Sequence, residues 1–422
     1  MIDQKETTKA SVATLSKKEL PHQKLLDNLK NFIGEIPYEE GNTFLNQPVL
    51  VNNDYLVNSE RMSSILNSLL VMFVYNYFRD VRIQGVYQLD KELQEILSMT
   101  EGVPYELGLY RPDYIYDING QAKICEIGCR YPINGWMLST YLNSSVSSLV
   151  KNVDENWNAI PEQNDFIEEL SGRFDADEPI FIVRKSEKGT EVNYLKNELA
   201  SKGITMIDVA PEDLQLVGGQ VMAGDQAARQ FYLEMDREEL KSFDKDVLKA
   251  IIKSGRCIND VRTLILIHDK RILTLLYNEE IMGSYINLDD YNFLKSYLIP
   301  SFNIDNPGDR EFLLNSEENW ILKPNSGGRG IDMHVKSECD PKVWENLVQN
   351  EWNNYMVQPY VEQKKFEINR NGTTESINLV GLDLCFNGKS YGPGLFRGSS
   401  KSIVNLHQGR GVVFPCVLDK SE

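Results

Sequence analysis

The pattern of apolar and polar positions predicts mainly helices in the first quarter of the chain. Residues 22–95 carry long helical signals, and the strongest is SERMSSILNSLLVMFVYNYFRDV. Ser59 is an N-cap candidate there, because it precedes an apolar stripe with helical spacing. The most apolar stretch, Leu69 to Phe78, has about half the length that a membrane-spanning helix needs. We therefore expect a buried scaffold helix and no membrane anchor.

A strand, a turn and a second strand follow. Residues 111–117 (RPDYIYD) and 122–127 (AKICEI) alternate, and the Asn-Gly pair between them is typical of a tight hairpin turn. The pattern predicts a β-hairpin with one acid on each arm, Asp113 and Glu126.

A small α/β unit is predicted from Pro179. An apolar strand, a polar loop, an amphipathic helix ending near Gly203 and another strand follow one another. The unit lacks the glycine-rich turn of a dinucleotide site, so we expect no nicotinamide cofactor. A structural role is favoured over a share in substrate binding.

The second half of the chain is predicted to be rich in strands. The apolar run 261–267 reads as a strand that delivers Lys270 near the start of a helix. Further strands are expected at residues 320–324, 355–358, 378–386 and 402–406.

Composition narrows the choice of partners and compartment. Asp and Glu total 62 against 44 Lys and Arg among 422 residues, a formal charge of -18, which disfavours nucleic acid and anionic membranes as partners. The N-terminus has no apolar secretory core, so the cytoplasm is expected. The six cysteines do not form a disulfide framework, and strand-end packing is favoured over a zinc site for Cys125 and Cys129.

The most distinctive segment is an apolar strand that ends in a lysine and runs into a glycine-rich loop. It reads WILKPNSGGRGI from Trp320. Phosphate oxygens need a close backbone, which glycines permit, and a lysine adds a point charge for the anion. The order of residues is not that of a P-loop. The phosphate-binding candidates are Lys323, Ser326, Gly327, Gly328 and Gly330.

About 35 residues later, YMVQPYVE is an apolar strand that runs into a polar turn. Such a segment can offer backbone groups to an adenine edge and a carboxylate to ribose hydroxyls. The candidates are Gln358, Tyr360, Val361 and Glu362.

The order of LKPNSGGRGI, MVQPYVEQ, GLDLCFNG, Phe396-Arg397 and residues 403–409 (IVNLHQG) resembles that of the ATP-grasp ligases. The resemblance implies that Lys323 and its glycine flap cover a triphosphate and that the strand at Gln358 holds adenine. It also implies that Arg397 and Asn405 lie near the metals and the acyl phosphate.

The metal-binding acids of these ligases normally follow those elements, whereas here the candidates precede them. Arg111-Pro112-Asp113 and Glu126-Ile127-Gly128 resemble the permuted ATP-grasp domain of glutathionylspermidine synthetase and related amide ligases of specialised metabolism. The resemblance implies that Asp113 and Glu126 are metal ligands and that Lys270 contacts phosphate. Gly128 stands where those relatives have asparagine, so a third ligand is missing, and Asn134 or water is the substitute.

The implied fold is α/β, a circularly permuted ATP-grasp fold with a Rossmann-like pre-grasp domain. We expect a helical region with the metal-binding hairpin in residues 1–160, a Rossmann-like substrate domain in residues 161–265, and the nucleotide-binding region in residues 266–422.

The resemblance implies an ADP-forming ligase that uses ATP and Mg²⁺, with two ions expected. A carboxylate of an amino acid or peptide would be activated as an acyl phosphate and coupled to an amine. Arg111 and Arg397 would neutralise the transferred phosphoryl group or orient the carboxylate. His268 and His407 are left out of the catalytic set, because this chemistry does not require a histidine.

Three alternatives stay open. The acceptor can be a thiol on a carrier protein, the enzyme can be a kinase that stops at phosphoryl transfer, or the chain can be a degenerate nucleotide-binding module without turnover. The two small-molecule substrates and the oligomeric state are not specified by the sequence.

Overall fold

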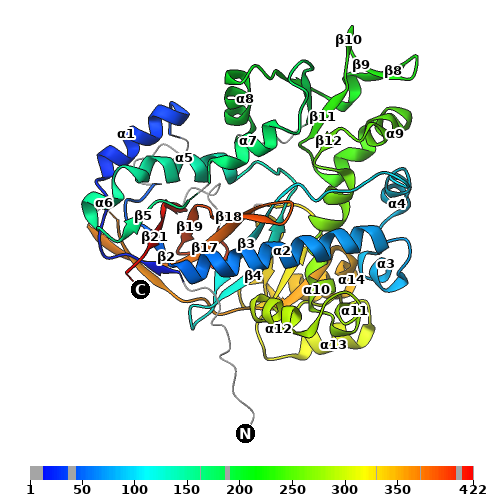
Figure 1. The fold of residues 1–422 in the computed structure, drawn as a ribbon. Helices are drawn as coiled ribbons and strands as arrows, with labels where there is room; N and C mark the ends of the chain where they lie inside the picture. Colours follow the sequence, from blue (N-terminus) through cyan, green and yellow to red (C-terminus); the bar gives the residue numbers. More distant parts are fainter. Residues whose placement is uncertain are drawn as a thin grey trace.

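The computed structural model describes residues 13–36, 44–161, 163–185, 191–328, 330–370, 372–404 and 411–421. The fold is mixed α/β and contains several sheets with helices around them (Figure 1). The chain also contains helices α5 (Trp136–Ser147), α6 (Val150–Val153), α7 (Asp165–Ser171), α9 (Lys245–Ser254), α11 (Glu279–Met282) and α12 (Leu288–Tyr297).

The predicted helical region is confirmed. Its helices are α1 (His22–Ile33), α2 (Asn53–Asn76), α3 (Val81–Tyr87) and α4 (Lys91–Ser98). The expected start of α2 at Ser59 is wrong, because Asn52 caps the helix by accepting a hydrogen bond from the Tyr55 amide at 3.0 Å. Ser59 is buried inside the helix, where its hydroxyl lies 2.7 Å from that of Ser390.

The central sheet joins segments that are more than two hundred residues apart. Its strand order is β20-β19-β17-β3-β4, with β16 and β18 also paired to β17. The predicted hairpin is confirmed as β3 (Leu109–Tyr116) and β4 (Ala122–Gly128). The other strands are β16 (Phe366–Arg370), β17 (Thr373–Phe386), β18 (Lys389–Pro393), β19 (Phe396–Ser399) and β20 (Val412–Phe414). Helix α2 runs along one face of this sheet (Figure 1).

The α/β unit predicted from Pro179 is confirmed as a parallel sheet. Its order is β12-β11-β6-β7, and helix α8 (Val192–Ser201) connects β6 to β7. The strands are β6 (Ile180–Val183), β7 (Met206–Val209), β11 (Gln230–Leu233) and β12 (Cys257–Ile258). A small antiparallel sheet projects beside it, made of β8 (Leu214–Val217), β9 (Gln220–Ala223) and β10 (Gln226–Ala227).

A fourth sheet carries the lysine strand. It has the order β14-β13-β15 and packs on helices α13 (Pro307–Asn315) and α14 (Pro341–Asn350). Strand β13 (Trp320–Pro324) has the predicted bounds, β15 (Tyr355–Pro359) is one residue longer than predicted, and β14 is His334–Val335.

Two predicted strands do not form as expected. Residues Thr263–Ile267 form a π-helix, because a run that is apolar on every side is as compatible with a buried helix as with a strand. Lys270 still precedes a helix, α10 (Ile272–Tyr277). Ser402–Val404 lie outside any strand, and the remainder of that prediction falls outside the described residues.

The two ends of the described chain meet in a fifth sheet. It has the order β1-β2-β21-β5, and β2 runs parallel to β21. The strands are β1 (Thr14–Leu15), β2 (Val49–Val51), β5 (Trp157–Asn158) and β21 (Cys416–Asp419). The predicted first and last regions therefore interleave, and the boundaries at residues 160 and 265 stay predictions. Among the described helices, none has both the length and the apolar character needed to cross a membrane.

Candidate functional site

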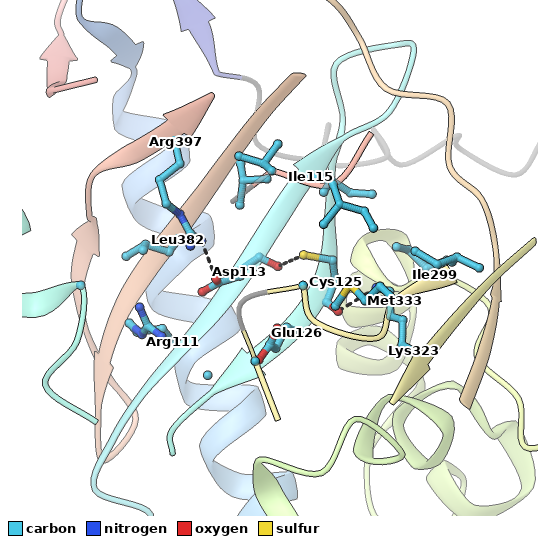
Figure 2. Close-up of a pocket in the computed structure, with 18 of the residues that line it drawn as sticks. Arg111, Asp113, Ile115, Cys125, Glu126, Ile299, Lys323, Met333, Leu382 and Arg397 are labelled. Carbon is cyan, nitrogen blue, oxygen red and sulfur yellow. Dashed lines mark hydrogen bonds and ion pairs between the residues drawn. The ribbon is translucent and has the colours of Figure 1, made fainter. Parts of the chain in front are cut away.

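A cavity of about 290 Å³ lies between the central sheet and the sheet that contains β13 and β15. It brings together residues from β3, β4, β17 and β19 on one side and from β13 and β15 on the other (Figure 2). Of the predicted site residues, those that line it are Arg111, Asp113, Glu126, Lys323, Gly328, Gly330, Gln358, Tyr360, Val361 and Arg397.

The two predicted metal ligands share one face of the hairpin. Asp113 and Glu126 are directly opposite each other in the β3–β4 register, so their side chains point to the same side. The register shifts beside this pair, which leaves Cys125 as an extra residue that also lines the cavity. Lys323 donates from Nζ to the Cys125 carbonyl at 3.1 Å. The early hairpin and the late lysine strand are therefore in direct contact.

Each acid faces a cation. Arg397 donates from Nη2 to Asp113 Oδ2 at 2.6 Å, whereas Asp113 Oδ1 is buried and has no hydrogen-bond partner among the described residues. Glu126 lies 3.8 Å from Lys270 Nζ. Burial alone would raise the pKa of Glu126, but Lys270, Lys323 and other nearby charges lower this pKa to about 2. Glu126 is thus a carboxylate at neutral pH.

Lys270 holds the glycine-rich loop in place through two hydrogen bonds. Its Nζ donates to the Gly327 carbonyl at 2.8 Å, and its amide donates to the Asn325 carbonyl at 2.9 Å. Lys270, Ser326 and Gly327 do not line the cavity, although Gly328 and Gly330 do. Burial lowers the pKa of the nearby Lys323. Lys270 therefore positions the loop, and Lys323 is the lysine that faces the cavity.

Gly128 has a structural reason to lack a side chain. A Cβ at Gly128 would lie 2.6 Å from Arg111 Nη2, and a Cβ at Gly135 would lie 2.5 Å from Arg111 Nη1. The Arg111 guanidinium occupies the slot between these two glycines, where a side chain at position 128 would otherwise project. Asn134 lines the same cavity and has a buried, unpartnered Oδ1 among the described residues.

The predicted ribose ligand is not brought to the cavity. Glu362 is exposed and does not line the cavity, while Gln363, the next residue, does. Strand β15 ends at Pro359, so the alternation of side chains along the strand no longer predicts which residue points inward. Asn405, the predicted neighbour of the acyl phosphate, lies outside the described residues.

Glu191 was not singled out by the sequence. It comes from the α/β unit, and its carboxylate accepts hydrogen bonds from the Gly135 and Leu138 amides at 2.7 and 2.9 Å. These amides belong to the first turn of α5, so Glu191 fixes the helix that borders Arg111. Burial raises the pKa of Glu191. The α/β unit thus contributes Glu191 to the cavity, whereas the sequence favoured a structural role for this unit.

His268 also lines the cavity, although it was left out of the catalytic set. Burial lowers the pKa of His268 to about 4, so its ring is neutral at pH 7. Neither ring nitrogen has a hydrogen-bond partner in the described part of the chain. A lone histidine gives no periodic signal in a sequence, and only the fold shows that it faces the cavity.

The two acids fit a cation that prefers oxygen ligands. Asp113 Oδ1 is buried and has no partner within the described part of the chain, and Glu126 is a carboxylate on the same face. No cluster of three or more His, Cys, Asp or Glu suited to a metal occurs among the described residues, so further ligands would come from a bound nucleotide and water. Burial raises the pKa of the neighbouring Cys125 thiol to about 12.

Comparison with known proteins gives limited similarity. Residues 62–266, slightly less than half of the chain, match a family model described as the AnkG N-terminal domain. The crystal structure of a RimK domain protein ATP-grasp from Sphaerobacter thermophilus DSM 20745 is 13% identical over 57% of this chain and 90% of that chain, with a TM-score of 0.30. A TM-score this low does not establish a shared fold. No curated protein matches the chain. The function therefore has to be inferred from the cavity itself.

Proposed function

We propose that the chain is an ATP-dependent ligase of the ATP-grasp kind in circularly permuted order, which joins a carboxylate to an amine. The observation that supports this most is the meeting of Asp113 and Glu126 with Lys323 and the glycine-rich loop in one cavity. These residues are separated by about two hundred positions in the chain, and their convergence is what the permuted order requires.

Two parts of the cavity suit two parts of a nucleotide, the triphosphate and the base. Lys323 and the loop at Gly328 and Gly330 would hold the triphosphate, because an ammonium group and close backbone suit phosphate oxygens. The apolar side chains of Ile299, Ile321 and Met333 line the part of the cavity formed with β13 and β15 and would enclose the base.

Asp113 and Glu126 would hold Mg²⁺, and the presence of two ions stays a prediction. The bound metal would neutralise charge on the phosphate oxygens. Arg397 is tied to Asp113 and lies beside this position, where it would stabilise the phosphoryl group in transfer. Arg111 lies further along the same face of the hairpin, in register with Gly128, where it would orient the acceptor carboxylate.

The proposed reaction has two balanced steps. A carboxylate oxygen attacks the γ-phosphorus of ATP, so that an acyl phosphate forms and ADP leaves. An amine then attacks the acyl carbon, phosphate leaves, and the amine loses a proton to give the amide. The protein supplies positioning and fixed charge for both steps. An amino acid or peptide is the proposed carboxylate, and a carrier-protein thiol in place of the amine is the alternative.

Lys323→Met tests the nucleotide site. Loss of a charged hydrogen-bond donor to phosphate, worth roughly 1.5–3 kcal/mol, should weaken ATP binding about 10- to 100-fold. Isothermal titration calorimetry with ATP and Mg²⁺ measures the change. Lys249→Met is the matched control, because Lys249 is exposed on α9, and it should leave the affinity unchanged. Equal affinities of both variants would contradict the assignment.

Turnover separates the ligase from its alternatives. Phosphate release is measured against a panel of amino acids with and without amines, and hydroxylamine traps any acyl phosphate as a hydroxamate. A ligase gives hydroxamate with its carboxylate substrate and forms amide when the amine is present. A kinase releases ADP without an amine and forms no amide, and a degenerate module binds ATP without turnover. Glu126→Gln should abolish turnover while circular dichroism shows a retained fold.

A further inference from the structure

Gln358 has a buried side-chain oxygen that no donor among the described residues satisfies. The residue is 1% exposed, and no donor in the described part of the chain reaches Oε1. In the β13–β15 register Gln358 lies opposite Ile321, so both side chains are on the face that lines the cavity. A buried acceptor without a partner costs about 1–3 kcal/mol, which a ligand donor would recover.

The orientation of the Gln358 amide is determined by Ser301. Gln358 Nε2 donates to Ser301 Oγ at 2.8 Å, and Ser301 Oγ donates to the Ile299 carbonyl at 2.8 Å. A hydroxyl carries one hydrogen, which Ser301 uses on that carbonyl, so Ser301 Oγ can only accept from Gln358. The amide must therefore present Nε2 to Ser301 and leave Oε1 for another partner.

Ser301 is itself held in place by both sheets that border the cavity. Its segment pairs with β4 through a bridge between Leu298 and Ile124, and with β15 through a bridge between Phe302 and Val357. Ser301 is 2% exposed, so water has little access to its hydroxyl. The hydrogen-bond chain from Ile299 through Ser301 to Gln358 is thus fixed before any ligand binds.

The surroundings of Gln358 favour a flat apolar ring. Ile299, Ile321 and Met333 line the same cavity, and Figure 2 shows Ile299 and Met333 near Lys323, on the opposite side of the view from Arg111 and Arg397. A heterocyclic base would bury its faces against such side chains and place its edge at the amide oxygen.

We infer that Ser301 is a positioning residue that makes the proposed nucleotide site select adenine over 6-oxopurines. By accepting from Nε2, it leaves Gln358 Oε1 as the acceptor for the exocyclic amino group of the base. This inference rests on the proposed nucleotide site. A 6-oxopurine presents an acceptor where adenine presents a donor, so two oxygens would face each other with no hydrogen between them. Specificity arises from the orientation of one amide.

The test compares ATP with ITP, which has a 6-oxo group in place of the 6-amino group. Dissociation constants are measured with Mg²⁺ by competition against a fluorescent ATP analogue. The unaltered chain should bind ATP about 10- to 100-fold more tightly than ITP, as expected for one unsatisfied buried acceptor.

Two variants separate the roles of the amide and its positioning residue. In Ser301→Ala the amide is free to rotate and offer Nε2, so discrimination should fall to a few-fold, mainly through tighter ITP binding. In Gln358→Met the amide is absent, and discrimination should be lost through weaker ATP binding. Ser64→Ala, on the exposed side of α2, is the control and should keep the original ratio.

The outcomes distinguish this inference from the proposed function. Equal binding of ATP and ITP by the unaltered chain would overturn the inference while leaving the nucleotide site in place. Unchanged discrimination in folded Ser301→Ala would overturn the role of Ser301. Binding of neither nucleotide would overturn both the inference and the proposed function.

Discussion

At the residue scale, Gly128 illustrates how the absence of a side chain shapes the cavity. Sequence comparison alone makes this glycine look like a lost metal ligand. In the structure, the Arg111 guanidinium fills the space that a side chain at position 128 would need, and Gly135 closes the slot from the other side. Gly128 and Gly135 thus leave the space that the Arg111 guanidinium occupies, so the position of this arginine depends on both glycines.

Gly128→Ala should displace Arg111. The added Cβ would lie 2.6 Å from Nη2, so the guanidinium has to move. Turnover should fall by roughly 10- to 100-fold, the cost of misplacing a positioning group, while ATP affinity changes little. The phosphate-release assay and calorimetry measure the two effects.

Gly85→Ala is the matched control, because a Cβ there meets nothing within 4 Å. It lies inside helix α3 and should leave turnover unchanged. Full activity of Gly128→Ala would contradict the dependence of Arg111 on this glycine.

The residues that the sequence could predict are those with a local signal. Asp113 and Glu126 stand on alternating strands beside an Asn-Gly turn, and Lys323 ends an apolar strand before a glycine-rich loop. Glu191 and His268 have no such signal, because they reach the cavity only through the packing of distant elements. Glu362 was misplaced because the strand ends before it.

At the scale of elements, local patterns predicted the segments that alternate or carry turn residues and failed at some of the others. The hairpin β3–β4 and strand β13 follow from alternation and turn chemistry. The π-helix at Thr263–Ile267 was missed because its residues are buried on all sides and show no period. The start of α2 was missed because its polar first turn, which Asn52 caps, precedes the apolar stripe.

Asn52→Ala tests that helix start. Its side chain satisfies the Tyr55 amide, so removal should destabilise the fold by about 1 kcal/mol, as for other lost N-caps. Urea denaturation measures the change. Ser64→Ala, an exposed site within α2, should stay within about 0.5 kcal/mol of the unaltered chain. Equal effects of both substitutions would place the functional cap elsewhere.

At the scale of the whole molecule, the chain is held together by sheets whose strands come from both of its ends. Strand β17 pairs with β3, and β21 pairs with β2, so the N-terminal and C-terminal halves share a core. Sequence reasoning anticipated that the hairpin belongs with the later strands only through the family resemblance. Pairings over such distances leave no trace in local periodicity.

The shared core contains a buried carboxyl group that should make stability depend on pH. Asp383 of β17 accepts hydrogen bonds from Tyr55 of α2 and Tyr114 of β3 at 3.0 and 3.2 Å. Burial raises the pKa of Asp383 from 3.8 to about 6. The folded state therefore keeps a proton that the unfolded state loses, so this group's contribution to stability is full below pH 4 and is lost as pH rises through 6.

Asp383→Asn should remove this dependence. Between pH 5 and pH 8 the stability of the unaltered chain should fall relative to that of the variant by about 1 kcal/mol. Urea denaturation at both pH values measures the difference. Asp225→Asn, at an exposed turn, is the control and should show no such change. Parallel behaviour of Asp383→Asn and the unaltered chain would show that Asp383 does not titrate in this range.

The central claim is that residues from the two ends of the chain form one site for a nucleotide and its metal. A crystal structure with a nonhydrolysable ATP analogue and Mg²⁺ tests it most directly. The account predicts the base beside Ile321 and Gln358, the phosphates at Lys323, and metal density in contact with Asp113 and Glu126. A nucleotide bound elsewhere, or no nucleotide at saturating concentration, would contradict it.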